Sequence, residues 1–325
     1  MTLESQKVPW YKKLTSGDSE MGQLGKQLQP LVGLIIIFAA FFILAPTFRQ
    51  GVAIRDVLEQ SAVLLIMATG TTIVLISGGL DLSVGSNLAL VAVVAGSLLL
   101  GGMPVWVAVV AGLLTGTFVG FLNGFIIVKT EVPPFVVTLG MLMIVKGFAL
   151  LIGVGKDMSR FPEAFQALGS KFVGPVVITM LSVVAVWFIL NRARLGFNAY
   201  AIGGNAEVAR LSGIGVKLNQ VIFYSIGGLM AAVASIVQTA RLDFATPNRG
   251  EGIELQAIAA VVIGGTSLFG GVGGVGRTVI GVLIIKMLEA GLIHLHVGSF
   301  WQRIAIGVVI ILAVWLDRLQ RRERV

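Results

Sequence analysis

Long apolar stretches separated by short polar segments make up most of the chain. Windows of about 20 apolar residues, enough helix to cross about 30 Å of hydrocarbon, recur along it. They predict ten membrane-spanning helices, at 30–48, 57–77, 83–101, 104–127, 133–155, 173–190, 220–240, 255–271, 277–295 and 300–316. The interval 255–271 is short and rich in glycine. The pattern therefore predicts an all-α, polytopic integral membrane protein.

Composition supports this class. Hydrophobic residues make up 56% of the 325 residues and charged residues 12%, whereas an ordinary soluble domain is about 45–50% apolar with glycine included and about 25% charged. The mean hydropathy is +0.94. There is no cysteine, which excludes a disulfide framework, a thiolate metal site and a cysteine nucleophile.

The intervals divide the chain into three parts. A polar segment, 1–29, is too long and hydrophilic for the start of a signal peptide, so 30–48 is predicted to be an uncleaved first span. The transmembrane domain covers 30–316 and a basic tail covers 317–325. The longest connection, 191–219, is too short for a soluble catalytic domain. The chain is therefore not expected to be an enzyme.

Charge predicts the orientation. With ten spans both ends share a side, and if that side is the cytoplasm, fourteen lysines and arginines lie inside and seven outside. Such a bias over short loops is typical of membrane proteins with basic inner segments. The net charge of +8 is thus interpreted as a record of orientation and not as a sign of nucleic-acid binding.

One glycine-rich stretch resembles a nucleotide-binding motif. Gly270–Arg277 reads GGVGGVGR and contains G-x-G-x-x-G, but a dinucleotide site needs a strand before that motif and a helix after it. Here the stretch joins two predicted spans, and no G-x-x-x-x-G-K-[ST] loop occurs. We expect a tight inner turn in which glycine permits positive φ and close helix approach. No cofactor is expected.

A second glycine pattern runs along one span. Gly112, Gly116, Gly120 and Gly124 recur every four residues, which is typical of a helix face that another helix approaches closely. Packing within one subunit is favoured over a subunit interface.

Two glycines interrupt the apolar pattern in SGGLDLSVGSN, residues 77–87. Asp81 and Ser83 are suited to cap the helix that resumes there. Broken helices at membrane depth commonly line transport sites. Asp81, Ser83 and Asn87 are therefore candidate residues of a translocation path, and an ordinary inner turn is the alternative.

Ionisable side chains within spans are costly and therefore informative. Lys146 lies centrally in its span, and it is either a path residue or a structural lysine bonded to carbonyl groups. Lys286 and Glu289 are three residues apart and can neutralise each other on one helix face, although Glu289 is also a candidate path residue. His294 and His296 lie at an outer turn and are interpreted as interfacial, so no metal site is expected.

The inner loop 191–219 contains a predicted short helix. After the flexible Gly203–Gly204, Asn205 can cap a helix over 206–212 that Gly213 ends, with Glu207 and Arg210 placed to suit its dipole. About two turns are not stable alone in water. This helix must pack against a partner protein or against the chain's own span ends.

Three segments together carry a family resemblance. GGLDLSVGS (78–86), RLGFNAYAIGGNAEVARLSGI (194–214) and ELQAIAAVVIGGTSLFGG (254–271) resemble permease subunits of ATP-binding-cassette importers for ribose, xylose, galactose, arabinose, related furanoses and autoinducer-2. The resemblance covers essentially the whole chain. It implies that the short helix is a coupling helix for the ATPase, with candidate residues Gly203, Gly204, Asn205, Glu207, Ala209, Arg210, Ser212 and Gly213.

The resemblance also implies partners and a location. It predicts separate cassette ATPase subunits, a periplasmic or lipid-anchored sugar-binding protein, a second permease copy or homologue and a small sugar as substrate. It places the chain in the bacterial cytoplasmic membrane. An ion-coupled secondary transporter using Lys146, Lys286 or Glu289, and a branched-chain amino acid permease, remain alternatives, whereas an integral membrane enzyme is disfavoured because no catalytic cluster occurs.

Overall fold

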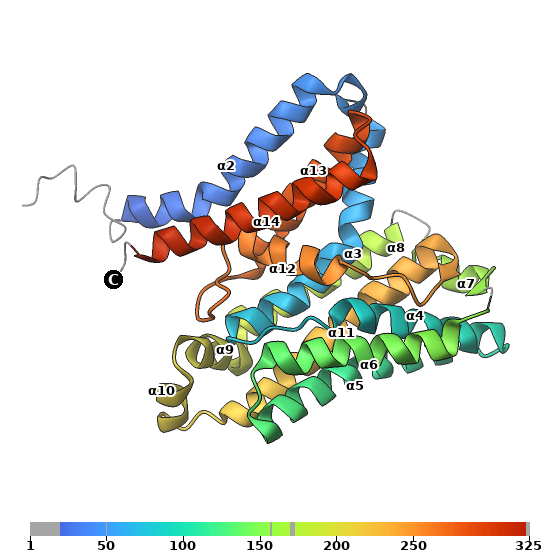
Figure 1. The fold of residues 1–325 in the computed structure, drawn as a ribbon, viewed down its shortest axis with the longest axis horizontal. Helices are drawn as coiled ribbons and strands as arrows, with labels where there is room; N and C mark the ends of the chain where they lie inside the picture. The colour runs from blue at the N-terminus through green and yellow to red at the C-terminus, as the bar shows by residue number, and fades with distance from the viewer. Residues whose placement is uncertain (1–19, 50, 157, 170–172, 323–325) are drawn as a thin grey trace, which may run out of the picture.

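A computed structural model describes residues 20–49, 51–156, 158–169 and 173–322, which are almost entirely helical (Figure 1). The elements are α2 (Glu20–Leu44), the 3-10 helix η1 (Pro46–Arg49), α3 (Gly51–Ile76), α4 (Val84–Leu100), α5 (Val105–Thr130), α6 (Pro134–Gly153), β1 (Met158–Ser159), α7 (Glu163–Gln166), α8 (Val173–Arg192), α9 (Arg194–Gly204), α10 (Ala206–Leu211), α11 (Val216–Leu242), β2 (Phe244–Ala245), α12 (Ile253–Ile263), α13 (Val275–His294) and α14 (Ser299–Arg322). The predicted all-α membrane class is confirmed.

Five of these helices are long and apolar enough to cross a membrane, within the part of the chain that the structure describes. They are residues Arg55–Ile76 of α3 and the whole of α5, α6, α8 and α11. The other predicted intervals also contain helices, but the number of ten spans stays a prediction. Helix α2 begins at Glu20 and so extends into the predicted polar tail 1–29. Residues 1–19, and 323–325 of the predicted basic tail, lie outside the described residues.

The interval 255–271 is not one continuous helix. Helix α12 has 11 residues, and at 1.5 Å per residue it is roughly 16 Å long, about half of the hydrocarbon thickness. Gly264 closes it, and Gly265 follows with φ +90°. The apolar residues beyond belong to a loop and not to a span.

Helix α3 is central to the packing. In its membrane-length window 83% of the residues are buried, against 22–28% for the windows of α5, α6 and α8. Figure 1 shows α5 and α6 on one side of the molecule and α2, α13 and α14 on the opposite side. The outer helices therefore present apolar side chains outward, as a lipid environment requires.

The glycine ridge of α5 packs on α11. A Cβ at Gly116 would lie 2.6 Å from that of Ala232 and 2.8 Å from the Gly228 carbonyl, and a Cβ at Gly120 would collide with the Tyr224 carbonyl. Both partners are on α11, so the predicted packing within one subunit is confirmed. Small residues here let two backbones approach more closely than side chains would allow.

At one end of the molecule two connections are joined by a minimal sheet. β1 and β2 pair antiparallel, with Met158 opposite Ala245 and Ser159 opposite Phe244. Asp243 adds a bond, since its Oδ1 accepts from the Phe161 backbone N–H at 2.8 Å. This clasp fixes the position of Phe244–Ala245, after which the chain continues to α12.

Candidate functional site

Helix α10 has the predicted cap. The Asn205 Oδ1 accepts from the backbone N–H groups of Glu207 and Val208, each at 3.0 Å. The helix covers Ala206–Leu211, Ser212 is its C-cap, and Gly213 follows at φ +85°. The cap and the glycine stop are therefore confirmed, with an end one residue earlier than predicted.

One side of α10 packs on its own chain and the other is exposed. Ala209 is buried, whereas Val208 is 57% and Leu211 73% exposed. Glu207 and Arg210 form an exposed bidentate pair at 2.6 and 3.0 Å. The hydrogen bonds from Arg210 lower the pKa of Glu207, so this carboxylate stays charged at neutral pH. The buried side of α10 therefore packs on its own chain, and the exposed side is available to a partner protein.

Residues 194–204, which the sequence predicts to be part of a loop with flexible glycines, form helix α9. Gly203 and Gly204 are its last residues. A Cβ on Gly203 would collide with the Ile76 carbonyl at the end of α3, whereas one on Gly204 would meet nothing within 4 Å. The prediction of a flexible link is wrong, because Gly203 is held by a close contact between two backbones.

We call Gly78, Gly203, Gly270 and Gly271 the glycine junction. The Gly271 N–H donates to the Ile76 carbonyl at 2.9 Å. A Cβ at Gly270 would lie 2.8 Å from the Gly203 carbonyl oxygen and 3.0 Å from the Gly78 Cα. Gly78, Gly270 and Gly271 have φ of +80°, +87° and +75°. The predicted positive φ and close approach are confirmed, and they join the end of α3, the end of α9 and the loop after α12.

Asp81 and Ser83 lie in a buried network beside this junction. The Asp81 Oδ1 accepts from the Ser83 backbone N–H at 2.8 Å and from its hydroxyl at 2.7 Å. Asn123 on α5 donates to the Ser83 hydroxyl at 2.7 Å and to both Asp81 oxygens at 3.3 Å. Ser83 precedes α4 but makes no side-chain capping bond. The expected capping of α4 by the Ser83 side chain is wrong, because its hydroxyl bonds to Asp81 and Asn123 instead. Asp81 does accept a backbone N–H at the helix start, that of Ser83.

Asn87 crosses between helices. Its amide donates to the Gly116 carbonyl at 3.1 Å and to the Gly228 carbonyl at 3.5 Å, which connects α4 with α5 and α11. Asn87 is 1% exposed. In this conformation it joins three helices at the point where the glycine ridge brings them closest.

Lys146 holds a non-helical segment against α6. Its ammonium donates to the Pro247 carbonyl at 2.9 Å, the Asn248 Oδ1 at 3.2 Å and the Glu251 carboxylate at 2.6 Å. The order of the predicted spans puts segment 246–252 on the outer side, and that side stays a prediction. The segment runs between the helices, because Gly250 is packed against Gly85 in the first turn of α4, and α12 begins where the segment ends.

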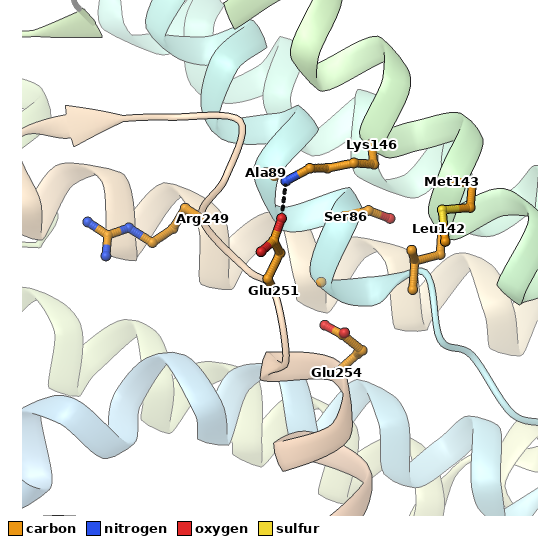
Figure 2. Close-up of a pocket in the computed structure, with 9 residues that line it drawn as sticks. Ser86, Ala89, Leu142, Met143, Lys146, Arg249, Glu251 and Glu254 are labelled. Carbon is orange, nitrogen blue, oxygen red and sulfur yellow. Dashed lines mark hydrogen bonds and ion pairs between the residues drawn. The ribbon is translucent and has the colours of Figure 1, made fainter. Parts of the chain in front are cut away.

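A cavity of about 230 Å³ opens where this descending segment meets α4 and α6. It is lined by Gly85, Ser86, Ala89, Leu142, Met143, Lys146, Arg249, Glu251 and Glu254. Figure 2 shows the Lys146–Glu251 pair above Glu254 and the Arg249 guanidinium pointing away from Glu251. Of the five predicted path residues only Lys146 is in this set.

Glu254 has one carboxylate oxygen without a partner. Its Oε1 accepts from the Gly252 N–H at 3.1 Å, while its Oε2 is buried and makes no hydrogen bond. A Cβ at Gly85 would collide with that Oε2, so the carboxylate reaches over the bare backbone at the start of α4. The Arg249 Nε is likewise buried without a partner.

Lys286 and Glu289 form the predicted intrahelical pair on α13. The Lys286 Nζ donates to the Glu289 Oε2 at 2.7 Å, with side-chain exposures of 14% and 25%. The mutual neutralisation is confirmed. A path role for Glu289, like those of Asp81, Ser83 and Asn87, stays a prediction.

The sequence reading missed Ser86, Arg249, Glu251 and Glu254. A signal was present, because RGEGIE at 249–254 places three charges at the start of an apolar helix, where charge is costly. The sequence predicts a loop here, because no local pattern shows that the segment turns inward.

Comparison with known proteins gives concordant matches. Residues 53–314 match the family model described as branched-chain amino acid transport system / permease component. The chain is 41% identical over 295 residues to the ribose import permease protein RbsC of Escherichia coli K12, covering 88% of this chain and 92% of that protein. It is 38% identical over 322 residues to RbsC of Bacillus subtilis, covering 97% and 99%. The galactose/methyl galactoside import permease protein MglC of E. coli K12 is 36% identical over 312 residues, covering 89% and 93%. No solved structure matches the chain.

Proposed function

This chain belongs to the family of branched-chain amino acid transport system permease components, and from that premise we propose that it is the membrane-spanning subunit of an ATP-binding-cassette importer for a monosaccharide. The similar proteins are named as ribose and galactose import permeases, which favours a sugar over an amino acid. ATP hydrolysis is assigned to separate cassette ATPase subunits.

The observation that carries this proposal is the connection of α10 to the interrupted helices. Helix α10 is capped at one end and exposes Val208 and Leu211. It directly follows Gly203 and Gly204, and Gly203 is packed against the end of α3 and against Gly271. A force applied to α10 by an ATPase would therefore reach both chain interruptions through backbone contacts. We assign ATPase coupling to residues 203–213 on this basis.

The remaining partners follow from the two ends of the molecule. The first turn of α2, the last turn of α14 and helix α10 lie on the left of Figure 1, and α7 lies on the right. We assign the left end, with both chain termini, to the cytoplasm of a bacterial inner membrane. The sugar-binding protein then docks at the end carrying α7 and the β1–β2 clasp. A second permease copy or homologue completes the membrane unit.

Reconstitution tests this function. The chain would be purified together with a cassette ATPase subunit and placed in liposomes in a defined orientation. A sugar-binding protein would be supplied on the side of the end that carries α7. We expect uptake of D-ribose or D-galactose that requires ATP and is insensitive to a protonophore. L-Leucine uptake under the same conditions would support the amino acid alternative. Sugar uptake that survives omission of the ATPase and collapses with the protonophore would support a secondary transporter.

A further inference from the structure

The cavity beside Glu254 is built from two helix starts. Ser86 lies in the first turn of α4 and Glu254 in the first turn of α12, and both helices begin after non-helical backbone. Irregular backbone at membrane depth is tolerated where it is buried in protein or lines a watery space. At about 230 Å³ the cavity far exceeds the roughly 10–15 Å³ that one water requires. It is smaller than the roughly 300–1,000 Å³ of drug-sized ligand pockets, so its scale is that of a small solute.

The polar groups of the cavity differ in the hydrogen-bonding capacity that they have left for a solute. Lys146 has three acceptors, Pro247, Asn248 and Glu251, which matches the three hydrogens of an ammonium group. The Glu254 Oε2 is buried without a donor. The Ser86 hydroxyl donates to the Ser83 carbonyl at 2.9 Å and keeps its acceptor capacity. The Arg249 Nε is also without a partner, but its guanidinium points away from the other lining side chains that Figure 2 labels. The cavity therefore presents a free carboxylate acceptor but no free lysine hydrogen.

This imbalance selects a chemical class. A neutral polyhydroxylated solute donates hydroxyl hydrogens to a carboxylate and brings no charge that needs a counter-ion. A zwitterionic amino acid would carry its own carboxylate towards Glu254 and Glu251. Of the two cationic lining residues, Lys146 is already engaged and the Arg249 guanidinium points away from the other labelled side chains (Figure 2). Leu142, Met143 and Ala89 supply apolar surface for the C–H faces of a sugar ring.

Resting on the proposed function, we propose that this cavity is a solute-contacting station on the import path for a neutral, polyhydroxylated solute of monosaccharide size. Glu254 is the principal acceptor. Lys146 is a positioning residue that holds segment 247–251 so that Glu254 faces the cavity. Gly85 is required because any side chain there would occupy the position of the Glu254 carboxylate.

The absence of native cysteine permits a direct test. Ser86→Cys and Ala89→Cys report on the cavity, and Ala92→Cys is the matched control because Ala92 is a buried residue of the same helix that does not line it. In the reconstituted complex we expect a hydrophilic methanethiosulfonate to modify positions 86 and 89 but not 92. At D-ribose or D-galactose concentrations several times half-saturation, modification should slow at least about threefold by simple occupancy, and L-leucine should have no effect.

Three results would overturn the proposal: no modification at either cavity position, modification unaffected by both sugars, or equal protection by L-leucine. A second variant gives an independent measurement. Glu254→Gln replaces the carboxyl group with an amide of nearly the same shape, and the maximal rate of sugar uptake should fall roughly tenfold or more. Glu131→Gln, at an exposed acid outside the cavity, should leave uptake at the wild-type rate. Wild-type uptake by Glu254→Gln would remove Glu254 from the station.

These outcomes are separable from failure of the proposed function. If the wild-type chain does not co-purify with the ATPase or shows no ATP-driven sugar uptake, the importer assignment fails. If the wild type imports sugar but the cavity cysteines are unreactive or unprotected, only the station fails.

Discussion

Lys146 uses its ammonium group entirely on its own chain. The side chain is 19% exposed and its partner Glu251 is 70% exposed. An ion pair with so much water contact contributes little by itself. The bonds to Pro247 and Asn248 matter more, because they fasten non-helical backbone to α6. Of the two readings that the sequence left open, the carbonyl-bonded lysine is the one seen, and it lies on the wall of the cavity.

The residue-scale prediction concerns this fastening. Lys146→Met should lower stability by about 1–2 kcal/mol, the usual cost of losing a partly buried polar contact, and should lower sugar uptake because segment 247–251 is released. Glu251→Gln should reduce uptake less. If both act through the same fastening, the double variant should be no worse than Lys146→Met alone.

The measurements are thermal unfolding of the purified protein and uptake in liposomes. Lys129→Met, which removes an exposed lysine from the end of α5, is the control for loss of charge. Full uptake by an abundant Lys146→Met protein would show that the fastening is dispensable.

At the scale of elements, α9 and α10 are a rigid extension and not a linker. Ala209 donates its N–H to the Asn205 carbonyl at 3.0 Å and is buried. Gly203 contacts the end of α3, and Gly271 donates to the same Ile76 carbonyl. The coupling assignment therefore depends on two separable features, the helical state of α10 and the closeness of the glycine junction.

The first feature is tested with proline. Ala209→Pro removes the N–H that donates to Asn205 and clashes with the preceding turn, at a cost of roughly 3 kcal/mol or more. Ala206→Pro is the matched control, because the first helical position tolerates proline and Asn205 is already extended, as the residue before proline prefers. We expect only Ala209→Pro to reduce the ratio of ATPase to permease after detergent purification, together with ATP-driven uptake. An unchanged ratio and rate would require the coupling assignment to be withdrawn.

The second feature is tested with a pair of neighbouring glycines. Gly203→Ala places a methyl group against the Ile76 carbonyl and the Gly271 nitrogen, whereas Gly204→Ala meets open space. Overpacking typically costs about 1–3 kcal/mol, so Gly203→Ala should lower the unfolding temperature and uncouple ATP hydrolysis from uptake. Gly204→Ala should match or slightly exceed wild-type stability, since alanine is favoured over glycine in a helix by roughly 0.5–1 kcal/mol. Equal behaviour of the two variants would contradict the glycine junction.

At the scale of the whole molecule, one end carries α10, the start of α2 and the end of α14, and the other end carries α7 (Figure 1). The β1–β2 clasp lies close in sequence to α7. The sequence predicts that the excess of basic residues lies on the cytoplasmic side. The arrangement of the helices is compatible with that assignment, because α2 begins and α14 ends on the side of α10.

Cysteine labelling of intact cells tests this orientation. Lys217→Cys and Arg322→Cys should resist an impermeant thiol reagent added outside, whereas Pro162→Cys should react. Lys217 and Pro162 are both exposed, so the side of the membrane on which each lies, and not burial within the protein, decides the result. Each variant should react after permeabilisation, which controls for the thiol itself. Labelling of Arg322→Cys from outside would contradict the prediction of ten spans with both ends in the cytoplasm.

Features determined by neighbours in sequence were predictable. The helical intervals follow from summed hydropathy, because lipid penalises polar backbone and charge wherever they lie. The Asn205 cap and the Lys286–Glu289 pair depend on residues within one turn. The α5 ridge follows from a four-residue period. Each of these interactions has both partners, or its whole pattern, within a single window.

Tertiary structure alone decided the features that join distant segments. Hydropathy cannot separate the short helix α12 from the glycine-rich loop behind it, because it does not report backbone conformation and Leu268 and Phe269 extend the apolar window into the loop. Nothing near Glu254 in the sequence indicates that its carboxylate lies over Gly85, and nothing near Gly203 indicates the Ile76 carbonyl. These contacts exist because α3, α4, α9 and α12 pack together, and packing between segments more than a hundred residues apart leaves no local pattern to read.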